Sequence, residues 1–394
     1  MSALIPAVLL AAGMQFVGSP AHSAAAPTGD VRLAPEQTAI ANSWIVVLKD
    51  GTTSTPSVAN QLTRRGNGRL SHVFRTAVNG FSAKMTQAQA RKVAADPRVA
   101  YVEQDAKVAL TDTQPNATWG IDRIDQRDLP LSGTYTYNTT ASNVHVYVID
   151  TGLRTSHNEF GGRASIGTDT VGDGQNGNDC NGHGTHVGGT AAGSTYGVAK
   201  GAAVVGVRVL DCEGSGTTSG VIAGVDWVTS NAAKPAVANM SLGGGASTSL
   251  DNAVKNSIAS GVSYSLAAGN GNIFGFPEDA CNVSPARVAE GVTVGATDSS
   301  DQRASFSNYG TCLDLFAPGV DVTSAWKDSN SATKTISGTS MAAPHVAGAA
   351  ALYLADNPSA SPAQVRDAIV NNATNGKVQD PKSGSPNKLL HSLF

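Results

Sequence analysis

Short, continuous apolar runs alternate with helix-like patterns through most of the chain, and this alternation restricts the possible folds more than any other feature. In the expected helices, apolar residues recur every three or four positions, as in Leu250, Val254 and Ile258. Strands that are apolar throughout are buried on both faces, and helical connections make neighbouring strands parallel. We therefore expect an α/β fold, a parallel sheet with helices on both faces. The expected strands are 144–149, 204–210, 236–240, 262–267 and 292–294.

The start of the last expected helix carries a capping pattern. Ser361 can accept a hydrogen bond at the helix start, Pro362 suits the first helical position, and Gln364 can reach back to the cap. We expect this helix to begin at Pro362.

A separate pattern occupies residues 43–111. Two helical stretches and four strand-like stretches follow one another in the order β-α-β-β-α-β, with an Asn79-Gly80 turn between the middle strands. This order predicts a small ferredoxin-like α+β domain of about 70 residues. The remaining residues, 112–394, form the α/β domain.

The two expected domains carry opposite charge. Residues 43–111 hold ten Lys and Arg against four Asp and Glu, whereas residues 112–394 hold 16 against 24. Opposite potentials favour docking of one domain on the other. Clusters of basic and aromatic residues are absent from the sequence, so nucleic acid is not an expected partner.

The first residues suggest export. An apolar run at 5–17 precedes small-residue cleavage sites near Ala24 and Ala26, although no basic residue precedes the run. We expect a signal peptide at 1–26, a linker at 27–42 and a secreted, extracellular product. The sequence contains no apolar run of 18 residues, so we expect no membrane span.

Four cysteines, all after residue 150, fit an oxidising compartment. Two disulfides can form from them in three ways, and four buried thiols are the alternative. We favour pairing of neighbours along the chain. The cysteines are Cys180, Cys212, Cys281 and Cys312.

Four polar residues stand at the expected ends of strands or starts of helices. Asp150 ends a strand, His183 lies on a Gly-rich approach to a helix, Asn270 ends a strand, and Ser340 precedes an apolar helix. Sites in parallel α/β folds lie at the carboxyl ends of strands. A serine hydroxyl becomes a nucleophile when a base takes its proton, and a helix start stabilises a developing anion. We expect Pro344 in the first turn of that helix, where its missing N–H costs nothing.

Each motif also has another reading. Asp150-Thr151-Gly152 occurs in aspartic proteases, but those need a second such motif, which the sequence lacks. His183 and His186 are spaced as metal ligands can be, without a glutamate between them. A zinc hydrolase and a non-catalytic binding protein therefore remain as rival classes.

The motifs VIDTGL, NGHGTHVGGT and GTSMAAPHVAG resemble the three active-site motifs of subtilisin-like serine proteases. The segments SLGGG, AAGN, RASFSNYG and SPARVAE resemble the proteinase K branch, and the cysteine positions and WGIDRIDQRDLPL its aqualysin-type bacterial extracellular members. The resemblance runs from Trp119 to the C-terminus, and residues 43–111 resemble the inhibitory propeptide. It also supports the pairing of neighbouring cysteines.

The resemblance implies a role for each motif residue. Ser340 would be the nucleophile and His183 the general base, oriented by Asp150, while Asn270 and the Ser340 N–H would form the oxyanion hole. An extended substrate would bind as an added strand, and an apolar pocket beside 267–269 would favour aromatic or aliphatic residues before the cleaved bond. The implied substrate-binding residues are Gly214, Ser215, Gly216, Ser241, Leu242, Gly243, Ala268 and Gly269.

The resemblance further implies structural calcium, bound by oxygen ligands. The implied ligands are Asp314, Ala289 and Gly291 at one site and Asp122, Asp125 and Gln126 at another. At the second site, Ser132 stands where a further carboxylate is expected.

Taken together, the sequence predicts a monomeric serine endopeptidase precursor that acts on proteins and peptides. Its own propeptide would inhibit it until the chain cuts itself near 110–112. The loop 271–280 is longer than the resemblance predicts and adds Phe274 and Phe276 near the site.

Overall fold

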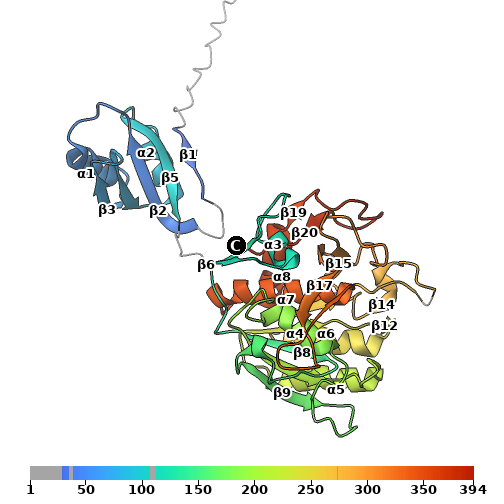
Figure 1. Cartoon of the computed structure of the whole chain (residues 1–394). Coiled ribbons are helices and arrows are strands. Elements are labelled where there is room, and N and C mark those ends of the chain that lie inside the picture. The colour runs from blue at the N-terminus through green and yellow to red at the C-terminus, as the bar shows by residue number, and fades with distance from the viewer. Residues whose placement is uncertain (1–28, 35–38, 107–111, 273) are drawn as a thin grey trace, which may run out of the picture. The chain divides into compact units, whose positions relative to one another are not determined.

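The computed structural model describes residues 29–34, 39–106, 112–272 and 274–394 (Figure 1). The expected signal peptide, part of the linker and the segment 107–111 next to the expected self-cleavage lie outside the described residues. The chain divides into two compact units, Met1–Val108 and Ala109–Phe394, and each is described by itself.

The smaller unit is a five-stranded sheet with two helices. Its strands lie in the order β1-β5-β2-β4-β3, and apart from the added β1 this is the ferredoxin-like arrangement, as predicted. Trp44, Leu62 and Phe81 are buried in its core. The elements are β1 (Val31–Arg32), β2 (Ala39–Leu48), α1 (Thr55–Arg65), β3 (Arg69–Phe74), β4 (Gly80–Lys84), α2 (Gln87–Ala94) and β5 (Val99–Ala106).

The larger unit is built on a nine-stranded sheet whose neighbouring strands are parallel, apart from the antiparallel pair β19 and β20. In spatial order the strands are β19 (Thr374–Asn375), β20 (Lys388–Leu389), β16 (Leu315–Pro318), β15 (Val292–Thr297), β13 (Ser263–Ala267), β11 (Ala236–Met240), β8 (His145–Asp150), β10 (Ala203–Arg208) and β9 (Ala164–Asp169).

Helices cover both faces of this sheet, as the apolar strands predicted. Val146 and Val148 of β8 pack into one core with α4 (His183–Ala192) and α7 (Thr339–Asp356). Tyr147 and Ile149 of the same strand point the other way, into a core with α5 (Thr218–Asn231) and α6 (Thr248–Ala259). Side chains alternate along a strand, so one apolar strand supplies both cores. The predicted α/β fold class is confirmed.

Shorter elements complete the larger unit. Three strand pairs lie outside the main sheet, and α8 begins at Pro362 with the predicted reciprocal cap between Ser361 and Gln364. None of the helices in the described part of the chain is long and apolar enough to cross a membrane. The additional elements are α3 (Trp119–Ile124), α8 (Pro362–Asn372), β6 (Asp112–Pro115), β7 (Thr134–Tyr137), β12 (Gly244–Gly245), β14 (Val283–Ser284), β17 (Val322–Ala325), β18 (Thr333–Ile336), η1 (Asn158–Phe160) and η2 (Ala280–Asn282).

The prediction that Pro344 lies in the first turn of its helix is wrong. Helix α7 begins at Thr339, so Pro344 lies within the second turn. A residue with an N–H at this position would bond to the Ser340 carbonyl four residues earlier. Because Pro344 has none, that carbonyl is left for another donor, and Ser241 Oγ donates to it at 2.7 Å. The proline thereby couples the start of α7 to the segment after β11.

Candidate active site

The residues predicted to carry chemistry come from separate elements at the carboxyl ends of the parallel strands. Asp150 is the last residue of β8, and His183 is the first residue of α4. Ser340 is the second residue of α7, and Asn270 lies three residues after β13. This is the edge at which a parallel α/β sheet places its functional groups.

Asp150 and His183 are joined directly. The carboxylate of Asp150 is fully buried, and its Oδ1 lies 2.8 Å from His183 Nδ1. The Thr151 N–H donates to the same oxygen at 2.7 Å. Because a carboxylate accepts, Nδ1 carries the proton in the neutral ring and Nε2 is left as an acceptor. The His183 side chain is 24% exposed, and its Nε2 is the atom left to accept a proton from a neighbouring hydroxyl.

The charge near His183 controls its pKa. Burial lowers the pKa of the imidazole, but the Asp150 carboxylate, with a further contribution from Asp179, outweighs burial and raises the pKa above its ordinary value. The protonated ring is thus stabilised where it would form during proton transfer.

Asp179 is a residue of the site that the sequence analysis did not identify. It is buried and accepts hydrogen bonds from the N–H groups of Asn181 and Gly182, just before α4, and of Thr185 in its first turn. The hydroxyl of Thr151 also donates to it, at 2.9 Å. Asp179 therefore caps the helix that carries His183 and links it to the turn after Asp150. An aspartate shortly before a Gly-rich helix start was the available signal.

Gly184 lets that helix approach the Asp150 turn. A Cβ on Gly184 would lie 2.1 Å from the Gly152 carbonyl oxygen, closer than any side chain allows. A glycine at this position is therefore required by packing between α4 and the turn after β8.

Ser340 is half-buried, and its hydroxyl donates to the Ser241 carbonyl at 3.0 Å. No hydrogen bond between Ser340 and His183 is found among the described residues. Both nevertheless line one cleft: His183 lines a cavity of about 570 Å³ and Ser340 one of about 520 Å³, and the two share the wall 242–245. Hydrogen bonds at such sites often form only with substrate present.

Asn270 is held in one orientation by Thr339. Its Oδ1 accepts from the Thr339 N–H at 2.8 Å and from the Thr339 hydroxyl at 2.9 Å. The N–H of Gly269 donates to that hydroxyl at 3.1 Å. With the amide oxygen occupied, the amide nitrogen is the atom left to donate toward the cleft beside Ser340. Thr339 is a second residue that the sequence analysis missed.

The predicted substrate-binding residues fall into two groups. The segments 214–216 and 241–243 both line the 570 Å³ cavity, while Gly269 lines the cavity next to Ser340. Ala268 does not line either of these cavities: it is fully buried, and its carbonyl accepts from Asn308 at 2.9 Å. It supports the pocket wall rather than forming its surface.

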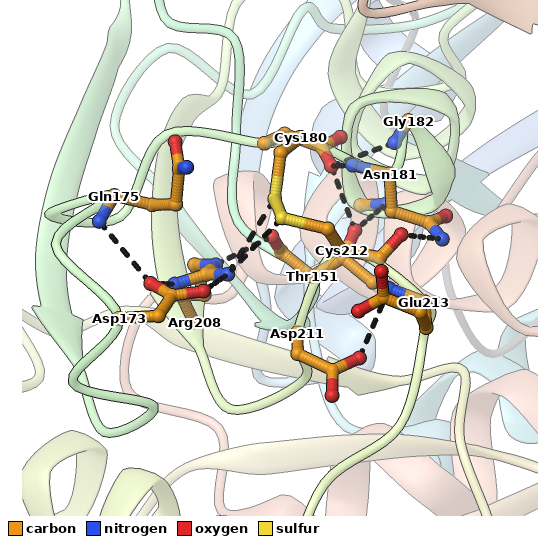
Figure 2. Close-up of a disulfide and its surroundings, with 12 residues drawn as sticks. Thr151, Asp173, Gln175, Cys180, Asn181, Gly182, Arg208, Asp211, Cys212 and Glu213 are labelled. Atoms are coloured by element: carbon orange, nitrogen blue, oxygen red, sulfur yellow. Dashed lines mark hydrogen bonds and ion pairs between the residues drawn. A yellow bond between two sulfur atoms is a disulfide. The ribbon is translucent and has the colours of Figure 1, made fainter.

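Two disulfides join neighbouring cysteines along the chain, Cys180 to Cys212 and Cys281 to Cys312. Figure 2 shows the first, which ties the residues before α4 to the segment that leads into 214–216. Asn181 reinforces the tie because its amide donates to the Cys212 carbonyl at 2.9 Å. The position of one cleft wall is thereby coupled to the helix that carries His183.

The first implied calcium site is occupied by a guanidinium group. Arg366 of α8 forms an ion pair with Asp314 Oδ1, and its Nε donates to the Gly291 carbonyl at 3.1 Å. The second oxygen of Asp314 accepts from the Thr293 N–H at 2.8 Å. Calcium takes six to eight oxygen ligands, and these oxygens are already used. In this arrangement Asp314 and Gly291 do not fit a calcium ion.

The second implied site differs in one respect: Asp122 and Gln126 already accept hydrogen bonds there, but one oxygen of Asp125 is left for a cation. Burial, together with the nearby charge of Asp122, raises the pKa of Asp125 to about 6, although the Thr136 N–H opposes this. The oxygens of Asp122 accept from the N–H groups of Ser132 and Gly133, and Gln126 Oε1 accepts from the Ser132 N–H. Asp125 accepts through Oδ2 alone among the described residues. Two neighbouring carboxylates are the oxygen donors that calcium prefers.

His186 does not act with His183 as a metal ligand pair. Its Nε2 lies 3.1 Å from both the Val322 and the Lys334 carbonyl oxygens, so this nitrogen carries a proton. Burial lowers the pKa of His186 to about 4. Within the described ranges, no group of three or more His, Cys, Asp and Glu side chains is placed to hold a metal. The donor set therefore gives no support to a zinc hydrolase.

Comparisons with known proteins show the family to which the chain belongs. The subtilase family model matches residues 141–387, and the peptidase inhibitor I9 model matches residues 37–111. An alkaline serine exoprotease A of Vibrio alginolyticus is 53% identical over 92% of this chain and 69% of its own length. An extracellular serine proteinase of Thermus sp. (strain Rt41A) is 56% identical over 83% of this chain and 78% of its own.

A solved structure extends the likeness to the fold. The crystal structure of a cold-adapted subtilisin-like serine proteinase is 60% identical, with a TM-score of 0.68, and covers 71% of this chain and 99% of that chain. The class that the fold, the site and these relatives define is a serine protease. The chain belongs to the subtilase family, and an I9-type propeptide precedes its peptidase unit.

Proposed function

We propose that the chain is the precursor of a secreted serine endopeptidase that hydrolyses peptide bonds with broad sequence specificity. The observation that carries the proposal is the bond between buried Asp150 and His183 beside the cleft that Ser340 lines. Secretion is supported by the apolar run 5–17, the two disulfides and the extracellular relative named above.

In the proposed reaction the Ser340 hydroxyl exchanges its bond to Ser241 for one to His183 Nε2. His183 takes the proton as Ser340 Oγ attacks the substrate carbonyl, and Asp150 stabilises the imidazolium. The Asn270 amide and the Ser340 N–H donate to the developing oxyanion. The C–N bond breaks, the leaving amine takes the proton from His183, and water then hydrolyses the acyl-enzyme by the same route.

Substrate is proposed to bind as an extended strand between the segments 214–216 and 241–243. The residue before the cleaved bond would enter the cavity beside Ser340, which is lined largely by glycine and small or apolar residues. Such a pocket accepts many side chains and favours aromatic or aliphatic ones. Phe274 and Phe276 of the neighbouring loop are exposed and available to substrates or solvent.

The I9-type unit is proposed to inhibit the peptidase until the chain cuts itself near 110–112. The excess of basic residues in 43–111 and of acidic residues in 112–394 supports their association. We also propose one structural calcium at Asp122, Asp125 and Gln126, where a cation would offset the repulsion between the two carboxylates.

The decisive test is Ser340→Ala in the full chain. We expect an unprocessed precursor that does not hydrolyse casein or a fluorogenic peptide. Ser359→Ala is the matched control, because Ser359 is exposed beyond the other end of the same helix. A normally shortened product from Ser340→Ala would contradict self-cleavage. Inhibition by a chelator but not by phenylmethylsulfonyl fluoride would favour a metal hydrolase.

A further inference from the structure

Helix α8 reaches the amino ends of the sheet strands through one side chain. Asp314 lies just before β16 and Gly291 just before β15, so both belong to the edge opposite Asp150. Arg366 of α8 contacts both: Nη2 pairs with Asp314 Oδ1, and Nε donates to the Gly291 carbonyl at 3.1 Å. The Asp314 side chain is 9% exposed and that of Arg366 31%.

Each oxygen of this buried carboxylate has one hydrogen-bond donor, and a second cation lies nearby. Thr293 of β15 donates its N–H to Asp314 Oδ2 at 2.8 Å, and Lys388 of β20 adds positive charge nearby. Burial raises the pKa of Asp314, and these donors oppose that rise. A guanidinium suits the position because its planar fork presents several donors at once, to a carboxylate and a carbonyl together.

We propose that Arg366 is a built-in replacement for a metal ion at this edge. Its guanidinium joins the Asp314 carboxylate to the Gly291 carbonyl, the oxygens that a calcium ion would otherwise need. The charge is supplied by the chain itself, so this part of the molecule is held together whether or not calcium is present.

The arrangement also fixes α8 on the sheet. Val365 and Ile369 of α8 are buried in the main core, and the intervening Arg366 provides a polar link to the loops before β15 and β16. Removing the guanidinium leaves Asp314 buried without its closest charge partner, which is a costly change. It also leaves an oxygen-lined space, so the variant should acquire a calcium site at this edge that the parent does not have.

The experiment compares Arg366→Ala with its parent, both as full chains carrying Ser340→Ala so that proteolysis does not blur unfolding. Thermal unfolding is followed with EDTA and with 10 mM calcium or magnesium chloride. In EDTA, Arg366→Ala should lower the melting temperature by about 2–6 °C. Calcium should recover part of that loss, beyond the rise it produces in the parent, whereas magnesium should not. Calcium binding at Asp122 and Asp125 occurs in both chains, so it does not contribute to the difference between their calcium-dependent rises in melting temperature.

Calcium stoichiometry by isothermal titration provides a second, direct measurement. The parent and its Asp314→Asn variant should bind the same number of ions, and Arg366→Ala should bind one more. Arg366→Lys keeps the charge but not the fork, so it should show a smaller loss of melting temperature than Arg366→Ala.

Two results would overturn the proposal. One is loss of a bound calcium ion from the parent on Asp314→Asn; the other is an equal calcium-dependent rise in melting temperature for the parent and Arg366→Ala. Because every chain here lacks Ser340, neither result bears on the proposed peptidase activity.

Discussion

The two edges of the central sheet use a buried aspartate in opposite ways. At the carboxyl edge, Asp150 binds His183 through one oxygen, and its other oxygen has no hydrogen-bond partner among the described residues. At the amino edge, Asp314 has both oxygens occupied, by Arg366 and by the Thr293 N–H.

The difference shows what distinguishes a candidate active site from a stabilising ion pair in this fold. At the carboxyl edge the imidazole of His183, the amide nitrogen of Asn270 and the hydroxyl of Ser340 all adjoin an open cleft, where a substrate can complete their hydrogen bonding. At the amino edge both oxygens of Asp314 already have partners, and the charge pair serves stability. An unpartnered buried oxygen costs stability, so the free oxygen of Asp150 next to a cleft lined by His183 indicates function.

The largest expected effect is the loss of kcat when the carboxylate at the carboxyl edge is replaced by an amide. Asp150→Asn should lower kcat by about four orders of magnitude, because an amide neither fixes the tautomer of His183 nor stabilises its charged form. Activity requires neutral His183, so it rises with pH through the raised pKa of that residue. Removing the Asp150 charge should move the midpoint to lower pH. Peptide hydrolysis and self-cleavage of the precursor between pH 5 and 10 measure both effects.

Asp314→Asn is the matched variant for this comparison. It should leave the pH profile unchanged and lower the melting temperature, whereas Asp150→Asn should change the melting temperature by only about 2 °C. Equal loss of activity from both variants would remove the distinction between the two edges.

Local sequence patterns were enough to predict the central strands and the start of the last helix. Apolar runs gave β8, β11 and β13 to within about one residue, and Ser361-Pro362-Ala363-Gln364 located the start of α8. These features depend on residues close together in the chain. The residue types at strand ends, with the family resemblance, were likewise enough to bring together Asp150 and His183.

Contacts between distant segments were not predictable in this way. Arg366 lies 52 residues from Asp314, and nothing around it in the sequence marks it as the partner of a buried carboxylate. The depth of Pro344 in α7 depends on where that helix begins, which the apolar pattern alone leaves open by several residues. Asp179 and Thr339 act by orienting other side chains, so only the three-dimensional arrangement identifies them.

Thr339→Val tests how much the orientation of the Asn270 side chain contributes to kcat. The substitution keeps the shape but removes the hydroxyl that donates to Asn270 Oδ1 and accepts from the Gly269 N–H. Losing an oxyanion donor outright costs about 3–4 kcal/mol, so a misoriented donor should cost less, about a tenfold loss of kcat with little change in KM.

Thr339→Ser supplies the control, since it retains the hydroxyl and should restore most of kcat. If Thr339→Val and Thr339→Ser have equal kcat values, or if KM alone changes, the hydroxyl does not position Asn270.

The smallest expected effect concerns the charge at the cavity beside Ser340. Among its described lining residues Glu278 is the one charged side chain, and its N–H is held by Asn308 Oδ1 at 2.9 Å. A partly exposed carboxylate attracts a basic substrate side chain weakly, because water and salt screen the charge. Glu278→Gln should therefore lower kcat/KM for a peptide with lysine before the cleaved bond by about two- to threefold relative to its leucine counterpart. The change in this ratio should shrink in 0.5 M salt. If the lysine-to-leucine ratio of kcat/KM is the same in the parent and in Glu278→Gln at low salt, the pocket selects substrates by shape alone. Among the groups at the carboxyl edge, only the reacting ones would then use unfilled hydrogen-bonding capacity to act on substrate.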